Sequence, residues 1–143
     1  MTFDVERLWE EFCPGVYIRL GLHCVEKYVT DDLYDEQAWA RFSGGNIVVR
    51  LVMERTDLLA FLAPSSHEPK WYVQEIAGWL GEGWVNIPAG DREQFQQLGA
   101  FLKRRWTELQ ELFAPERVEA SLARLEESAK LQEAERRRRY MGE

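Results

Sequence analysis

Apolar and polar residues alternate along four stretches in the first half of the chain, which is the pattern of half-buried β-strands. These stretches are residues 16–29, 37–43, 46–54 and 58–63. In the first stretch the alternating apolar positions are Val16, Ile18, Leu20, Leu22 and Cys24. In the third, one face is Ile47, Val49, Leu51 and Met53, and the other is Val48, Arg50, Val52 and Glu54. A sheet built from such strands buries one face and leaves the other in contact with water.

Short turns separate these stretches. Gly44 and Gly45 stand between the second and the third, and such a pair favours a hairpin because glycine tolerates a positive φ. Residues 55–57 turn the chain again, and residues 64–66 end the fourth stretch. Connections this short force neighbouring strands to run antiparallel, so the last three stretches are expected to form a meander.

Elsewhere the apolar residues recur at the three- to four-residue spacing of amphipathic helices. A short helix is expected to begin at Thr2 or Asp4 and to stop at Pro14. Another is expected to open within residues 66–69 and to end at Gly81, a natural C-cap. The inner positions of this second helix are Tyr72, Ile76, Trp79 and Leu80.

Two further helices are predicted in the C-terminal part of the chain. The first begins at Asp91, with Gln94 placed as in a capping box, and breaks at Pro115. Its apolar stripe is Phe95, Leu98, Leu102, Trp106, Leu109 and Phe113. The last helix has a thinner stripe, which is Val118, Leu122, Leu125 and Ala129. Residues 132–143 lack a stripe and are expected to form a solvated helical extension or a frayed tail.

These elements predict an α+β fold. We expect a three- or four-stranded antiparallel sheet that helices cover on one face, followed by a C-terminal helical hairpin. Residues 1–113 are expected to form the globular domain, and residues 114–143 a helical extension. A length of 143 residues fits one domain of this kind.

The negative charge of the chain is concentrated in its first part. The formal net charge is −7; residues 1–90 contain 14 Asp or Glu and 7 Lys or Arg, whereas residues 91–143 contain 11 of each. A negative surface attracts basic partners and repels nucleic acid, so duplex DNA is not an expected partner. The N-terminus lacks a signal-peptide pattern and no apolar run is long enough for a membrane span, which predicts a cytoplasmic protein without a membrane partner.

One acidic segment carries the candidate binding residues. Asp31, Asp32, Asp35 and Glu36 surround Tyr34 in a predicted loop. An aromatic anchor ringed by carboxylates is typical of a docking surface for a basic protein, because the ring supplies buried area and the acids steer the partner. Glu10 and Glu11 are expected to adjoin this surface. The alternative is a solvated loop, with Tyr34 and Trp39 packed in the core.

The sequence offers little catalytic or metal-binding chemistry. His23 and His67 are the two histidines, and neither lies in a Ser-His-Asp pattern. Cys13 and Cys24 lack the C-x2-C spacing of zinc sites and are expected to be reduced thiols packed as small hydrophobes. No phosphate-binding glycine motif or calcium-loop register is present. We therefore expect no catalytic residue, no metal and no cofactor.

Three other hypotheses stay open from the sequence. Glu54, Arg55 and His23 could meet in a cleft and make the chain an enzyme. The tryptophans within residues 70–84 could stack on bases or sugars, although tryptophans at helical spacing more often belong to the core. Arg136–Arg139 could contact phosphate or an acidic partner, or could be a solvated helix end placed favourably for the helix dipole.

The stretch Gly44–Pro64, followed by Trp71 and Ile76–Gly81, resembles a small bacterial family. Its members have a strand, an E-R or D-R turn, a strand that ends in A-P, and a helix with a leading tryptophan. Similar chains occur among immunity proteins and other small proteins of bacterial conflict systems. The resemblance covers about residues 40–113 and implies a fold-level association without catalytic residues. This chain has Thr56 where the family has a glycine after the turn.

Composition and resemblance together suggest a non-enzymatic protein-binding module. The expected role is that of an immunity or inhibitor protein that neutralises a basic bacterial toxin or effector. Its candidate surface is Asp31, Asp32, Tyr34, Asp35 and Glu36, with Glu10 and Glu11. The alternative is a structural subunit or adaptor of a multi-protein bacterial assembly, held through its C-terminal helices. In that case the thin stripe within residues 115–131 would need a partner, and a second copy of the chain is one candidate.

Overall fold

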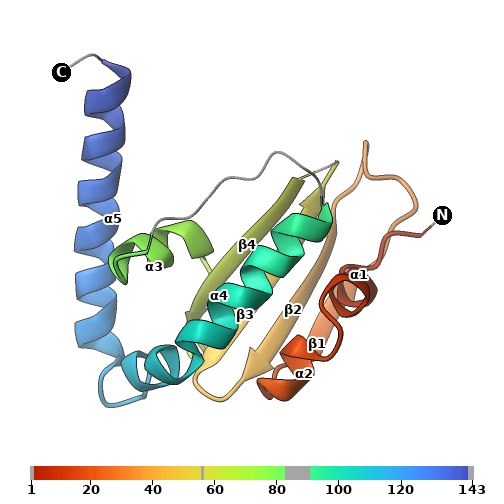
Figure 1. The fold of residues 1–143 in the computed structure, drawn as a ribbon, viewed down its shortest axis with the longest axis horizontal. Helices are drawn as coiled ribbons and strands as arrows, with labels where there is room; N and C mark the ends of the chain where they lie inside the picture. Colours follow the sequence, from red (N-terminus) through yellow and green to blue (C-terminus); the bar gives the residue numbers. More distant parts are fainter. Residues whose placement is uncertain (1, 56, 83–90, 142–143) are drawn as a thin grey trace.

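A computed structural model describes residues 2–55, 57–82 and 91–141 of the chain (Figure 1). The strands form one antiparallel sheet in the order β1-β2-β3-β4-β5. They are β1 (His23–Tyr28), β2 (Ala38–Gly44), β3 (Ile47–Glu54), β4 (Asp57–Pro64) and β5 (Trp71–Tyr72). The helices are α1 (Val5–Phe12), α2 (Val16–Arg19), α3 (Val73–Trp79), α4 (Asp91–Leu112) and α5 (Val118–Tyr140).

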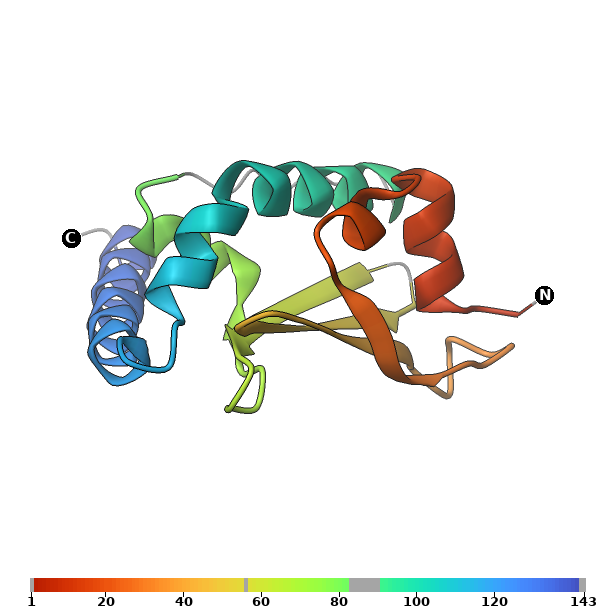
Figure 2. The same ribbon diagram turned by 90° about the horizontal axis from the view of Figure 1, so that it is seen from below.

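The helices α1, α2 and α4 lie on one face of the sheet (Figure 2). In the part of the chain that the structure describes, no helix covers the opposite face, which we call the helix-free face. At the β5 end of the sheet, α3 follows β5 and α5 packs against α3. The predicted α+β fold with helices on one sheet face is therefore confirmed.

Alternating positions divide the sheet residues between the two faces, as the sequence predicted for β3. Ile47, Val49, Leu51 and Met53 point toward the helices and are fully buried. Phe95, Leu98, Leu102 and Leu109 of α4 form the other side of this core and are equally inaccessible. The long helix thus binds the sheet through the stripe that its sequence spacing predicted.

The strand count was predicted wrongly: five strands are present where three or four were expected. The additional strand, β5, contains two residues, which is too short to produce a visible alternation. It pairs with β4 through Phe61 opposite Tyr72 and Leu62 opposite Trp71. Because β5 occupies these residues, α3 begins at Val73, later than the predicted start.

The alternating stretch that begins at Val16 was also misinterpreted, since it opens with the helix α2 and only later becomes β1. Gly15 adopts a left-handed φ of 72° before the helix. The segment is compatible with both periods. A helix would bury Val16, Tyr17 and Leu20 on one side, whereas a strand would bury Val16, Ile18 and Leu20. Burial decides between the two, because Tyr17 packs on Trp9 and leaves Ile18 exposed.

The expected C-terminal helical hairpin is replaced by a different packing. Helix α4 crosses the sheet, and α5 packs on α3, where Gln132 donates to the carbonyl of Glu75 at 3.1 Å. Leu125 is fully buried in the same core as the sheet residues, and Leu122 packs against that core. The thin stripe of α5 is therefore covered largely within this chain.

Both edges of the sheet are irregular or short. In β1, the pairing register with β2 shifts between Cys24 and Glu26, which leaves Val25 as a bulge residue that is 51% exposed. At the other edge, β5 has two residues. Among the described residues, no helix has the length and apolar character needed to cross a membrane.

Two glutamines fix α4 across the sheet. Near its start, Gln94 accepts the N–H of Leu58 at 3.0 Å. Sixteen residues later, or about 24 Å along the helix, Gln110 accepts the N–H of Asn46 at 2.8 Å and donates to the carbonyl of Gly44 at 3.1 Å. Each glutamine thereby satisfies backbone groups of a β-hairpin, and both ends of α4 are tied to the sheet.

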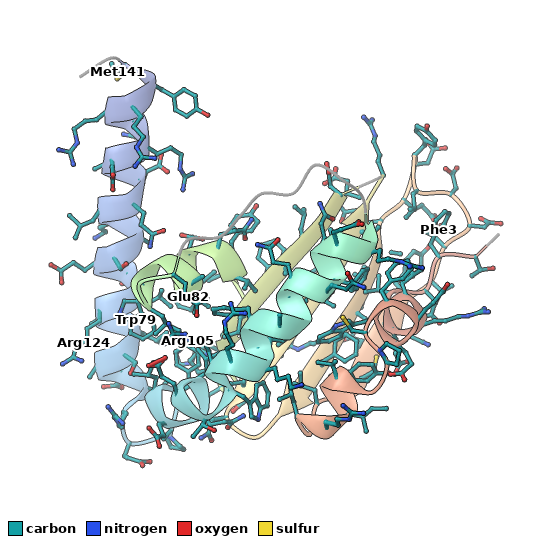
Figure 3. All side chains as sticks on the ribbon, viewed as in Figure 1. Phe3, Trp79, Glu82, Arg105, Arg124 and Met141 are labelled. Carbon is teal, nitrogen blue, oxygen red and sulfur yellow. The ribbon has the colours of Figure 1, made fainter. Side chains whose placement is uncertain are left out.

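A third connection joins the end of α3 to the middle of α4. Glu82 follows α3 and forms ion pairs with Arg105 and with Arg104, the latter at 2.6 Å. Figure 3 shows Glu82 and Arg105 close together beside α4. The paired guanidinium groups hold the pKa of the Glu82 carboxyl below its ordinary value.

Replacement of Gly45 by alanine tests the Gln110 connection. Gly45 has a φ of 58°, and a Cβ there would overlap the Gln110 carboxamide. We expect Gly45→Ala to lower the free energy of unfolding by about 2–4 kcal/mol, since backbone strain adds to the loss of Gln110 hydrogen bonds. Urea denaturation measures this change.

Gly81→Ala is the matched control for that substitution. Gly81 also has a positive φ, of 82°, but no atom lies within 4 Å of an added Cβ. We expect a loss of roughly 1 kcal/mol from strain alone. Equal losses in the two variants would contradict a role for Gln110 in holding the hairpin.

Candidate protein-binding surface

The acidic segment predicted from the sequence forms a defined loop between β1 and β2. We call residues Asp31–Glu36 the acidic loop. Leu33 points into the protein, where it is 9% exposed and belongs to the core, whereas Tyr34 is 83% exposed. The loop is thus anchored by one apolar side chain and presents the next side chain, an aromatic ring, to solvent.

Local hydrogen bonds set the shape of the acidic loop. The Asp32 carboxylate accepts the N–H groups of Tyr34 at 3.0 Å and Asp35 at 3.3 Å. The Thr30 hydroxyl accepts the N–H of Asp32 at 3.1 Å. Asp side chains commonly stabilise turns by this pattern, so the sequence itself determines where Tyr34 is placed.

Glu36 closes the loop onto β1. Its carboxylate accepts the hydroxyls of Thr30 and Tyr28, each at 2.7 Å. The hydrogen bonds from Thr30 and Tyr28 hold the pKa of Glu36 below its ordinary value, and the contact with Glu36 raises the pKa of Tyr28. Thr30 is itself fixed because its backbone pairs with Phe3.

The other carboxylates of the loop keep their charge uncompensated. Within residues 2–55, 57–82 and 91–141, no Lys or Arg side chain forms an ion pair with Asp31, Asp32 or Asp35. Nearby acids differ: Lys27 pairs with Asp4 at 2.9 Å and Glu6 at 3.0 Å. Asp31, Asp32 and Asp35 therefore contribute negative charge that no ion pair among the described residues neutralises.

Glu10 and Glu11 lie apart from the acidic loop. The loop is beside the start of α1, where Phe3 pairs with Thr30, whereas Glu10 and Glu11 are near the end of that helix. Glu10 accepts the N–H of Gly15 at 3.0 Å, and its second oxygen is buried. Its role is to close the turn between α1 and α2, which the sequence pattern did not indicate.

Aromatic and arginine side chains gather on the helix-free face. Strand pairing places Tyr28, Trp39, Val52 and Leu59 in one row across the sheet. The next row contains Arg41, Arg50, Phe61 and Tyr72. The guanidinium carbon of Arg50 lies 5.7 Å from the Trp39 ring centroid, and the rings of Phe61 and Tyr72 are 4.7 Å apart.

This face is open only in part, because Val48 and Val52 of β3, expected to contact water, are 2% and 4% exposed. Tyr28 and Tyr72 are 41% and 40% exposed, whereas Trp39 and Phe61 are half-buried against their neighbours. The loop after β4 lies over the end of the face near the β2–β3 hairpin, where Glu68 pairs with Arg41 at 3.1 Å.

The acidic loop and the helix-free face are continuous. Tyr28 belongs to the first row of the face, and its hydroxyl donates to Glu36 of the loop. The acidic loop therefore meets the helix-free face at Tyr28, which lies opposite Trp39, and Arg50 lies over the Trp39 ring. Sequence reasoning identified the loop but did not include the face, although Trp39 and Phe61 at outward positions were the available signal.

The remaining sequence hypotheses find little support in the geometry. His23 lies opposite Ser43 of β2, and Ser43 lies opposite Val48 of β3. Glu54 is six residues farther along β3, or about 20 Å, so His23 and Glu54 do not meet in a cleft. No group of three or more His, Cys, Asp or Glu side chains among the described residues is arranged to hold a metal ion. Trp71 is buried, and Trp84 lies outside the described residues.

The two cysteines are free thiols in contact with the core. Cys13 is buried and donates to the carbonyl of Phe95 at 3.4 Å. Burial raises the pKa of both thiols, so the neutral form is favoured. Their packing agrees with the expectation from the sequence.

Comparison of the chain with models of protein families, with curated proteins and with solved structures gave no match.

The Glu36 contact predicts a specific titration. In Tyr28→Phe the carboxylate loses one of its two hydroxyl donors, so we expect the pKa of Glu36 to rise toward its ordinary value. A carboxyl pKa that is depressed by folding stabilises the protein above the unfolded-state pKa, and this stabilisation is lost as pH falls through the folded-state value. Carbon-13 NMR of the Glu36 carboxyl group measures the shift.

Tyr34→Phe serves as the control, because the Tyr34 side chain is exposed and forms no hydrogen bond with Glu36 among those of the described residues. It should leave the Glu36 titration unchanged. The same Glu36 pKa in Tyr28→Phe and in the unmodified chain would contradict the assigned contact.

Proposed function

We propose that this chain is a protein-binding module that binds a basic partner through the acidic loop and the adjoining helix-free face. The observation that carries the proposal is the exposed Tyr34 ring among carboxylates that lack a cationic partner within the described residues. In this proposal the chain acts by binding, without catalysis of its own.

The two parts of the surface contribute in different ways. Asp31, Asp32 and Asp35 raise the local concentration of a basic partner and orient its approach. Tyr34 supplies a large apolar contact with a polar tip, and aromatic side chains of this kind often dominate binding energy. The acids therefore mainly accelerate association, whereas the ring mainly slows dissociation.

The helix-free face supplies the area that one loop lacks. A stable interface buries about 800 Å² on each partner, more than a six-residue loop can provide. Trp39 and Phe61 continue the surface, and arginine and aromatic residues are enriched in interfaces. Arg50 stacked near Trp39 suits a partner group that combines an apolar surface with a hydrogen-bond acceptor.

The biological role that we propose is neutralisation of a basic bacterial toxin or effector, as expected of an immunity or inhibitor protein. An acidic inhibitor can cover a basic active surface without chemistry of its own. The adaptor alternative loses its main argument, because Leu122 and Leu125 of α5 pack within this chain.

Capture experiments with loop variants test the proposal. We expect the tagged chain to retain a basic protein at low salt and to release it at high salt, because screening weakens charge attraction. Tyr34→Ala should weaken affinity roughly thirty-fold, equivalent to about 2 kcal/mol. Asp31→Asn, Asp32→Asn and Asp35→Asn combined should lower the association rate, measured by surface plasmon resonance with the captured protein.

A charge-matched control is Glu111→Gln, Glu116→Gln and Glu119→Gln combined, since these exposed acids lie away from the loop. This control should retain the partner as the unmodified chain does. Retention that ignores salt, or that falls equally in the control and the loop variant, would overturn the proposed surface. If the captured protein is toxic when expressed alone, co-expression with the unmodified chain should restore growth.

A further inference from the structure

A groove lies between α5 and the β5–α3 segment, at the end of the sheet far from the acidic loop. The projecting half of α5 forms one wall (Figure 3). The residues that matter for its chemistry are Tyr72, Ala129, Lys130, Ala134, Arg137 and Arg138. Tyr72, Ala129 and Ala134 contribute apolar surface to the groove, and its cationic side chains all belong to α5.

Cationic side chains outnumber carboxylates in this groove: Lys130, Arg136, Arg137 and Arg138 line it together with Glu75 and Glu133. Glu133 pairs with Arg136 at 3.4 Å and Arg137 at 3.3 Å, so one carboxylate serves two guanidinium groups. Among the described residues, Lys130 and Arg138 form no ion pair. The groove therefore combines the apolar surface of Tyr72, Ala129 and Ala134 with unneutralised positive charge along α5.

We propose that this groove binds the acidic loop of a second copy of the chain. The loop carries the complementary features: an exposed ring at Tyr34 and three carboxylates, Asp31, Asp32 and Asp35, that lack a cation. In the complex, Tyr34 packs against Tyr72, Ala129 and Ala134 of the neighbouring copy. The loop carboxylates pair with its Lys130, Arg137 and Arg138.

The loop and groove of one molecule cannot reach each other. The loop follows β1 and the groove adjoins β5, so the width of the five-stranded sheet, roughly 19 Å, separates them. Figures 1 and 2 show α5 and the β1–β2 loop at opposite ends of the molecule. Charge complementarity of two such distant sites is satisfied only between molecules.

Each copy offers one loop and one groove, so the contact is head-to-tail and adds molecules in a row or closes a ring. A contact made by one loop is small, and we expect it to be weak and sensitive to salt. This inference rests on the loop surface of the proposed function, and a basic partner would compete with the second copy for that loop.

Sedimentation velocity of the purified full chain tests the contact. At low salt the weight-average mass should rise with protein concentration, and at high salt it should return to that of the monomer. A loop variant (Asp31→Asn, Asp32→Asn, Asp35→Asn) and a groove variant (Lys130→Gln, Arg137→Gln, Arg138→Gln) should each remain monomeric alone. All substituted side chains are exposed, and circular dichroism verifies that both variants fold.

Mixing the two variants gives the most specific result. The loop variant retains an intact groove and the groove variant an intact loop, so the mixture should form a complex of one copy of each and no larger species. The control Lys103→Gln, Arg117→Gln and Arg124→Gln combined removes equal charge from exposed positions elsewhere. It should associate as the unmodified chain does.

A monomer at every concentration at low salt would overturn the inference, and so would a monomeric mixture. Equal loss in the control and the groove variant would overturn it as well. These outcomes are separable from failure of the proposed function, because the groove variant should still retain the basic partner. Loss of partner binding with intact self-association would instead contradict the proposed function alone.

Discussion

The fixation of α4 across the sheet is the constraint on which the rest of the structure depends. Its apolar stripe supplies Phe95, Leu98 and Leu102 to the core, but a stripe alone permits several angles between helix and sheet. Gln94 and Gln110 select one, because each satisfies backbone groups of a different β-hairpin. Backbone groups that are partly shielded from water are costly to leave without a partner, so sliding of α4 along the sheet is opposed at both ends.

This placement assigns different tasks to the two sheet faces. The face beneath α4 is consumed by packing, and α1 and α2 complete its cover beside β1 and β2. The other face keeps Tyr28, Tyr72 and Arg50 exposed, and Glu36 links it to the acidic loop through Tyr28. The stable part of the molecule thus serves as a rigid support for a surface that faces away from it.

The spacing of apolar residues predicted most elements, because within each of them the apolar positions repeat with one period, that of a helix or that of a strand. The stripe of α4 and the alternation of β3 were both read correctly, since each is long enough to distinguish 3.6 from 2 residues per repeat. The segment after Gly15 is too short for that distinction, and packing of Tyr17 on Trp9 decided in favour of α2. The two-residue β5 exists only because β4 provides an edge for it.

The candidate surface was predictable only in its local part. The acidic loop is visible in the sequence because its residues are contiguous. The helix-free face joins residues from all five strands, so its composition depends on strand register and on which face α4 covers. Glu10 was predicted as part of the binding surface because it is an acid near other acids in the sequence. Its carboxylate instead accepts the N–H of Gly15 and holds the turn after α1.

The two edge strands of the sheet limit aggregation through the addition of a foreign strand. An incoming strand would meet a bulge at Val25 along β1, and only two residues of backbone along β5. Bulged or very short edges give a foreign strand little to pair with, which is a common protection against growth into fibrils. The chain can therefore tolerate an apolar, partly uncovered sheet at high cellular concentration, with contacts directed to side chains and away from backbone addition.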